Sequence, residues 1–334
     1  MTIRTSPLLG GFHTSYQFSL SFISNLTLIF CKTGQFMSWE TAQLNLSPPP
    51  RSCSIMTELR SYATPQEYLD AALGFLSVRE VENGLLIGLP GGFRDQNAPQ
   101  PNCHFLTCSR DGVITAASVK TWAKAIVAGS GHGEEELRLL ADYYRRHDNN
   151  MQGVVGESVI AEAFAKIYHS GALTRRVMIT HELTRIKTLT ESAGSFEQAT
   201  MTDIELLTDW YVRFNDEVHS LPRITRVETK KNLTVRIEAG NVFIWRDDSG
   251  GIVSVAAVVR KTPNSCIIGI VYTPPELRGR GYASSVVSKL TEHILSSGFT
   301  KAGLFTEADN PISNSIYRKI GYEPIGEYMD VMFG

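Results

Sequence analysis

The stretch from Cys266 to Ser297 constrains the fold of this chain more than any other part of the sequence. An apolar run ends at Tyr272-Thr273, two prolines follow, and the next loop contains two glycines. Apolar residues then recur at helical spacing. A strand, a glycine-bearing loop and a helix N-terminus bring unpaired backbone amides together, and the helix dipole adds positive character there. This order predicts an anion-binding site, to which Arg278 and Arg280 add formal charge.

Several anion-binding motifs are excluded at this loop. The sequence contains no GxxxxGK[ST], so a P-loop is absent. The loop offers only Gly279-x-Gly281, which does not complete the dinucleotide-binding GxGxxG pattern. One Arg/Gly pair between a strand and a helix also lacks the low-complexity repetition of RGG-type RNA-binding segments. What remains is R-x-x-G-x-A, from Arg278 to Ala283.

This hexapeptide resembles the acetyl-CoA signature Q/R-x-x-G-x-G/A of the GNAT superfamily of N-acetyltransferases. Downstream come an expected strand at Ala302–Thr306, then Asn310, and seven residues later Tyr317 within Ser315–Tyr322 (SIYRKIGY). That segment is similar to the second GNAT block, N…(L/I)-Y-x-K-x-G-(F/Y). The resemblance covers roughly residues 196–334. It implies the acyl-CoA N-acyltransferase (GNAT) fold, an α/β (α+β) architecture with a mixed, mostly antiparallel sheet flanked by helices, preceded here by a smaller α/β domain.

The resemblance implies roles for individual residues. In this superfamily the strand before the loop splays from its neighbour, and the pantetheine arm of CoA bonds into the gap beside Val271, Tyr272 and Thr273. An N–H near Val271 would polarise the thioester carbonyl. Asn310 would contact the CoA arm, and Tyr317 would be the general acid for the leaving thiolate, with a packing aromatic as the alternative. The expected pyrophosphate-binding residues are Arg278, Gly279, Arg280, Gly281, Tyr282, Ala283 and Ser284.

No general base is assigned. An attacking amine must be neutral, so a base or a water chain is expected. Glu307, Glu217 and His219 are candidates, but each is better interpreted as a solvated surface residue. We also expect no metal, because the spacing of Cys103, His104 and Cys108 matches no zinc pattern.

The charge composition limits the kinds of partner molecule that we expect. The 334 residues carry 32 Lys+Arg and 34 Asp+Glu, a net charge of −2. This balance argues against a nucleic-acid or membrane-surface binder, so neither partner is expected. The five cysteines are odd in number and scattered, which favours a reducing compartment over a disulfide framework. We therefore expect a cytoplasmic protein.

The first 55 residues differ from the rest of the chain. Glu40 is their only acidic residue, while Ser, Thr, Phe and Pro recur. Phe18–Phe30 is too short and too polar for a membrane helix. Ordinary globular composition begins at Met56, so we interpret residues 1–55 as a disordered extension or a mis-called start. A targeting segment is the alternative.

Residues 56–190 are expected to form a degenerate GNAT-like domain, and residues 196–334 the GNAT domain. The first unit would form one side of the acceptor cleft or mediate homodimerisation. Its expected helices are 65–76, 134–147 and 157–168, and its expected strands are 84–89, 103–108, 112–117 and 175–186. In the second unit we expect a helix at 199–218 capped by Thr202, a hairpin at 241–260, and a closing strand at 322–333.

Two classes of function remain open. The first is an N-acetyltransferase that moves acetyl from acetyl-CoA to a primary amine, on a small molecule or a peptide, by direct attack in a ternary complex. A glycine N-acyltransferase-like enzyme is a variant of this class. The second is a non-catalytic acyl-CoA-binding module. The complete Arg278–Ala283 loop together with Tyr317 favours the enzyme, because a scaffold needs neither.

Overall fold

The computed structural model of the chain describes residues 56–96, 102–130, 133–148, 150–218 and 224–334. The expectations for residues 1–55, and His219, lie outside these ranges. The first half comprises β1 (Thr57–Tyr62), α1 (Pro65–Leu76), η1 (Ser77–Arg79), α2 (Gly84–Gln96), β2 (His104–Arg110), β3 (Val113–Thr121), β4 (Lys124–Gly129), α3 (Glu134–His147), β5 (Gly153–Glu157), α4 (Ser158–Tyr168) and β6 (Leu173–Leu183). The second half comprises β7 (Ser195–Gln198), η2 (Met201–Asp203), α5 (Ile204–Glu217), α6 (Arg226–Glu238), β8 (Val242–Arg246), β9 (Ile252–Lys261), β10 (Ser265–Tyr272), η3 (Pro275–Leu277), α7 (Tyr282–Ser296), β11 (Lys301–Glu307), α8 (Pro311–Ile320) and β12 (Glu323–Phe333).

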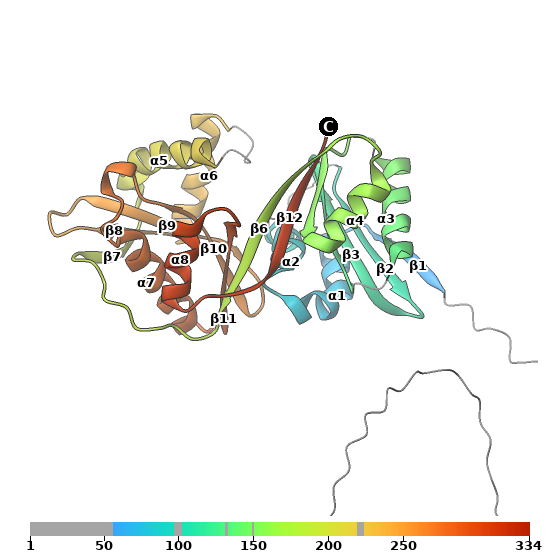
Figure 1. Cartoon of the computed structure of the whole chain (residues 1–334), viewed down its shortest axis with the longest axis horizontal. Helices are drawn as coiled ribbons and strands as arrows, with labels where there is room; N and C mark the ends of the chain where they lie inside the picture. Colours follow the sequence, from blue (N-terminus) through green and yellow to red (C-terminus); the bar gives the residue numbers. More distant parts are fainter. Residues whose placement is uncertain (1–55, 97–101, 131–132, 149, 219–223) are drawn as a thin grey trace, which may run out of the picture. The chain divides into compact units, whose positions relative to one another are not determined.

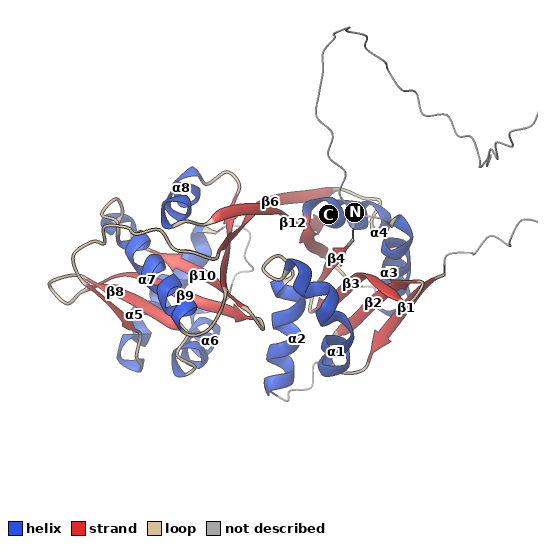
Figure 2. Ribbon diagram, turned by 90° about the horizontal axis from the view of Figure 1, so that it is seen from below, coloured by secondary structure: helices blue, strands red, loops and turns tan. Residues whose placement is uncertain are grey.

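The two halves have the same order of elements. Short 3₁₀ helices aside, each runs strand, two helices, three strands, helix, strand, helix, strand. Figure 2 shows α1, α2, α5 and α6 on one face of the sheet and α3, α4, α7 and α8 on the other. The first half therefore repeats the architecture of the second, and the mixed α/β fold class predicted from the sequence is confirmed.

The strands of the described residues all belong to one twelve-stranded sheet, in the order β1-β2-β3-β4-β5-β12-β6-β11-β10-β9-β8-β7. The last strand of each half is exchanged. β6, from the first half, pairs with β11, and β12, from the second half, pairs with β5. β6 and β12 run antiparallel side by side along their length (Figure 1). The sheet is thus continuous across the expected boundary near residue 190.

The start of α1 matches the sequence prediction. The Thr64 hydroxyl accepts a hydrogen bond from the Glu67 amide at 3.2 Å, while the Glu67 carboxylate accepts one from the Thr64 amide at 3.3 Å. This reciprocal capping box begins the helix where the sequence signals it. The helix expected at 199–218 instead begins as η2, and its capping residue is Thr200, paired with Asp203, rather than Thr202.

The strand predicted at 84–89 is wrong, because this segment opens helix α2. Gly84 and Gly88 lie four residues apart, on one face of the helix. An ideal Cβ at Gly84 would lie 3.3 Å from Ile267, and one at Gly88 would lie 3.1 Å from Arg260. The two glycines therefore let the α2 backbone approach β9 and β10 closely. A short apolar run does not distinguish this helix from a buried strand.

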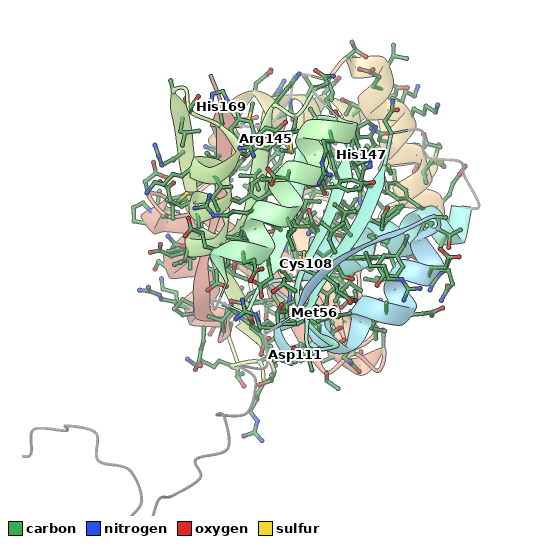
Figure 3. All side chains as sticks on the ribbon, turned by 90° about the vertical axis from the view of Figure 1, so that its right-hand side faces the viewer. Met56, Cys108, Asp111, Arg145, His147 and His169 are labelled. Atoms are coloured by element: carbon green, nitrogen blue, oxygen red, sulfur yellow. The ribbon has the colours of Figure 1, made fainter. Side chains whose placement is uncertain are left out.

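Two hydrogen bonds between Met56 and Asp111 hold the start of the first described strand in place. The Met56 amide donates to Oδ1 of Asp111 at 3.1 Å, and the Asp111 amide donates to the Met56 carbonyl at 3.0 Å. Figure 3 shows the two residues close together at the end of β1. β1 then pairs antiparallel with β2. The described fold therefore begins with a strand that the sequence analysis did not predict.

Candidate functional site

The main structural feature of the site is a gap between two neighbouring parallel strands. β10 and β11 pair only as far as Ile268 and Leu304, although β10 continues to Tyr272 and β11 to Glu307. Within β10, Ile270 has a φ of 54°, and the pairing with β9 shifts register between Gly269 and Tyr272. This bulge bends β10 away from β11. The end of β10, including Val271, is therefore free of ladder pairing on its β11 side.

The loop that follows β10 leads directly into α7. Gly279 and Gly281 have φ values of 79° and 82°, in the left-handed region that favours glycine, and Gly281 is the N-cap of α7. The first helical hydrogen bond runs from the Ser285 amide to the Gly281 carbonyl at 3.0 Å. The amides of Tyr282, Ala283 and Ser284 precede it and have no intrahelical acceptor. They form the helix N-terminus that the sequence predicted.

Ser192, which lies between the two expected domains, holds this loop in place through two hydrogen bonds. The Ser192 amide donates to Oγ of Ser285 at 2.9 Å, and the Ser192 hydroxyl donates to the Arg280 carbonyl at 2.8 Å. An ideal Cβ at Gly281 would lie 2.6 Å from Oγ of Ser192. The loop therefore has room for glycine alone at this position. No sequence signal identified Ser192, because its contact is with residues about ninety positions away.

Arg278 ties the loop back to the end of β10. Its Nε donates to the Thr273 carbonyl at 2.8 Å, and its Nη2 contacts Oε2 of Glu217 at 2.6 Å. Glu217 also accepts a hydrogen bond from the Tyr272 hydroxyl at 3.3 Å. Two of the three candidate bases are thus engaged in ion pairs, since Glu307 pairs with Arg176 at 2.5 Å.

Asn310 and Tyr317 both belong to α8, on the same face of the sheet as α7. Asn310 is the N-cap of α8, and its side-chain oxygen accepts a hydrogen bond from the Ser313 amide at 3.1 Å. Tyr317 is buried against Tyr322, with ring centroids 6.1 Å apart. Burial raises the pKa of the Tyr317 phenol above its ordinary value of 10. The phenol is therefore protonated at neutral pH, the form that a proton donor requires.

A buried histidine that the sequence analysis did not consider lies beside Tyr317. The His181 ring, on β6, is 6.3 Å from the Tyr317 ring, centroid to centroid. Its Nε2 lies 3.1 Å from Oγ1 of Thr306 and 3.3 Å from Oδ1 of Asn314, while its buried Nδ1 has no hydrogen-bond partner in the described part of the chain. Burial lowers the pKa of His181 despite the hydrogen bond to Asn314. It is therefore a neutral imidazole, brought to this site by the exchanged strand.

In the first half, the helix equivalent to α7 opens with acidic residues. Helix α3 begins with Glu134, Glu135 and Glu136. Glu136 is buried, accepts a hydrogen bond from Thr115 at 2.9 Å and pairs with Arg110 at 3.0 Å. An ideal Cβ at Gly133, the N-cap of α3, would overlap the Glu136 carboxylate. This helix start is occupied by the protein's own anion, which disfavours a bound phosphate.

The described cysteines carry no evident chemistry. Cys103, Cys108 and Cys266 are free thiols, and burial raises the pKa of Cys108 to about 12. Within the described ranges, no three His, Cys, Asp or Glu side chains come together as a metal site. No helix in the described part of the chain has the length and apolar character that a membrane-spanning segment needs.

A family model and several solved structures match this chain, whereas the curated proteins do not. A family model described as FR47-like protein matches residues 249–331, which contain the gap, the loop and α8. A search of the curated proteins gives no match. Solved structures match over most of the chain. They include a GNAT-family acetyltransferase from Colwellia psychrerythraea (11% identity, TM-score 0.54, covering 83% of this chain and 100% of that one).

Two further structures are similar to the same extent. A GCN5-related N-acetyltransferase from Sphaerobacter thermophilus is 14% identical, with a TM-score of 0.54, over 82% of this chain and 95% of that one. A Drosophila protein is 12% identical, with a TM-score of 0.56, over 83% and 98%. At such identities the likeness concerns the fold. The resemblance predicted from the sequence is confirmed: the described chain has the fold of the GNAT acetyltransferases.

Proposed function

We propose that the chain is an N-acetyltransferase that transfers acetyl from acetyl-CoA to a primary amine by direct attack in a ternary complex. The observation that carries the proposal is the gap between β10 and β11, which opens beside the glycine loop at the start of α7. A GNAT fold suggests acyl-CoA chemistry. The second half of the molecule has both the strand gap and the glycine loop that such a site needs. The acid-lined start of α3 argues for one such site per chain.

The residues present fit the acyl donor. The free amides of Tyr282, Ala283 and Ser284 lie at the start of α7, where the helix dipole favours the pyrophosphate. Glycine at positions 279 and 281 lets the backbone approach the phosphates closely. The unpaired edge of β10 at Val271–Thr273 would hold the pantetheine amides as an added strand would. An N–H near Val271 would donate to the thioester oxygen as negative charge develops on it.

Tyr317 supplies the proton in this scheme. The neutral amine attacks the thioester carbon, a C–N bond forms, and the C–S bond breaks. The departing sulfur takes the Tyr317 phenolic proton, while the amine loses one proton to water. The phenol then recovers a proton from solvent, so the products are the acetamide and free CoA. Because burial raises the pKa of Tyr317, the proton-donor form persists across the neutral range.

The test is calorimetric titration of acetyl-CoA into the full chain, followed by CoA release over a panel of primary amines. Micromolar binding and amine-dependent CoA release support the proposal. Binding without turnover of any amine would favour the non-catalytic acyl-CoA-binding module. A folded protein that binds no acyl-CoA contradicts both.

A further inference from the structure

Arg260 lies near the end of β9, opposite Ile267 of β10. Its side chain extends over the face of the sheet that carries α2, α5 and α6, since an ideal Cβ at Gly88 of α2 would lie 3.1 Å from its Cγ. That face is opposite to the α7 and α8 face, where the acyl donor is proposed to bind. An amine attacking through the gap would approach from the Arg260 side.

The Arg260 guanidinium has no counter-charge among the described residues. Its Nη1 is buried and makes no hydrogen bond, and the described residues offer it no ion pair. The ionisable groups that act on it are the Tyr328 phenol, whose pKa is raised by burial and which is therefore neutral, and a second cation, Arg236 of α6. Desolvation lowers the pKa of Arg260 to about 10. A cation with a buried, unpartnered nitrogen is costly unless an acceptor completes its hydrogen bonding, so this position favours a bound anion.

The position of Arg260 relative to the gap follows from the strand register and from the location of Tyr328. The Tyr328 ring lies 5.1 Å from Phe305, the first residue of β11 beyond the last rung shared with β10. Arg260 pairs with Ile267, which pairs with Gly303 of β11, two residues before Phe305, so Arg260 lies on the same face of the sheet as Phe305 and close to this level. Thr180 pairs directly with Phe305, and its buried hydroxyl also has no partner. Two polar groups without partners thus lie on the attacking side of the gap.

We propose that Arg260 binds a carboxylate of the acceptor, so that the acceptor is an amine that also carries a carboxylate, such as an amino acid. This inference rests on the proposed function for the role of the bound amine. A planar guanidinium matches a carboxylate with two parallel hydrogen bonds. Arg260 is only partly exposed, which leaves a route for a small ligand and not for a folded surface. A polyamine is disfavoured, because its charge has the same sign as Arg260 and Arg236.

The experiment compares matched acceptors. The common α-amino acids, β-alanine and a γ-amino acid are each paired with the primary amine that lacks the carboxylate, and kcat/KM is measured for the wild-type chain. We expect the carboxylated member to be preferred by about 10- to 100-fold, the range for hydrogen bonds to a charged group. Equal use of both members by the wild-type chain would overturn the assignment.

The variant Arg260→Gln is expected to lose this preference, mainly through KM of the acceptor, and to bind acetyl-CoA normally. Removing an unpaired buried charge should leave the melting temperature unchanged or raised. Arg260→Lys keeps the charge and loses the two-pronged geometry, so an intermediate preference is expected. The matched control is Lys261→Gln, which removes the same charge from the exposed neighbouring residue and should change none of these values. A preference that survives Arg260→Gln contradicts the proposal.

Direct titration of the carboxylated amines, without acetyl-CoA, separates the two proposals. Arg260-dependent binding in a protein that binds no acetyl-CoA would refute the acetyltransferase and retain the carboxylate site. Acetyl-CoA binding with turnover that ignores the carboxylate would do the reverse. Carboxylated amines that bind equally to the wild-type chain and to Arg260→Gln would also overturn the site.

Discussion

Glu80 and Asn264 lie 184 positions apart in the chain and are joined by two hydrogen bonds. The Glu80 carboxylate accepts from the Asn264 backbone amide at 2.7 Å and from its side-chain amide at 2.9 Å. The Thr262 hydroxyl donates to the same carboxylate at 2.5 Å. Because Glu80 lies between η1 and α2, this contact fastens the start of α2 to the β9–β10 turn. It holds in place the helix that packs on Arg260.

The first prediction concerns Glu80 and pH. Burial alone would raise the pKa of this carboxyl, but the hydrogen bonds from Thr262 and Asn264 outweigh it, and the pKa is lowered. The charged form is thus favoured in the folded state. Its contribution is complete above the unfolded pKa of about 4.3 and is lost as the pH falls through the lower folded value. We expect Glu80→Gln to cost about 2 kcal/mol of unfolding free energy at pH 7.

Urea unfolding of the wild-type chain and Glu80→Gln from pH 7 to pH 3 measures this effect. The difference between the two proteins should shrink below about pH 4.3, as the wild-type carboxyl becomes protonated. Glu58→Gln, at an exposed position of β1, is the control and should match the wild-type chain throughout. A difference that stays constant with pH would show that the Glu80 charge contributes nothing.

The second prediction concerns the loop before α7. Gly281→Asp places a Cβ against Ser192 and a carboxylate where the pyrophosphate is proposed to bind, so acetyl-CoA affinity should be lost. Gly279→Ala meets open space and carries only the left-handed backbone cost, about 1 kcal/mol, so a smaller loss is expected. Gly298→Ala, at the far end of α7, has a similar φ of 97° and also meets open space. Calorimetry should find its acetyl-CoA affinity unchanged. Unaltered binding by Gly281→Asp would exclude this loop as the binding site.

The third prediction concerns the proton donor. Tyr317→Phe should lower kcat by about 100-fold with little change in acetyl-CoA affinity, because only the transition state loses a proton source. Since burial raises the pKa of Tyr317, wild-type kcat should not fall between pH 8 and pH 9.5 through ionisation of this group. Tyr322→Phe is the matched control, as it removes a buried hydroxyl that bonds Thr291 at 2.8 Å. It should reduce stability and spare kcat. Equal kcat in wild type and Tyr317→Phe would leave Tyr317 as a packing residue.

The fourth prediction concerns stoichiometry. The buried Glu136 carboxylate and two further acids at the start of α3 leave no favourable phosphate site in the first half. Titration should therefore give one acetyl-CoA per chain in the wild type and none in Gly281→Asp. Two sites in the wild type, or one remaining in the variant, would show that the first half binds acyl-CoA after all.

The sequence predicted the second half well because its signals are local. The loop from Arg278 to Ala283 and the start of α7 depend on residues a few positions apart, as does the capping box at Thr64 in the first half. Local chemistry of this kind is readable from one sequence. The positions of these residues agree with the predicted constellation, while their roles in binding and catalysis remain predictions.

The missed features depend on distant contacts. His181 reaches the second half only because β6 is exchanged, and Ser192 contacts residues about ninety positions away in the chain. Helix α2 was predicted as a strand because Gly84–Leu89 is apolar on all sides, and only its packing on Ile267 and Arg260 explains the glycines. Arg260 itself lies in an ordinary strand pattern, and nothing nearby in the sequence marks its missing counter-charge.

The exchange of β6 and β12 has a consequence for how the molecule is made. The strand that completes the first half, between β5 and β6, is residues 323–333. During synthesis on the ribosome, the sheet of the first half therefore cannot be completed until almost the whole of the second half has been made. Until then β5 and β6 expose unpaired edges, which are templates for pairing with other chains. A nascent chain of this design therefore exposes strand edges to mispairing for longer than two independently closing domains would.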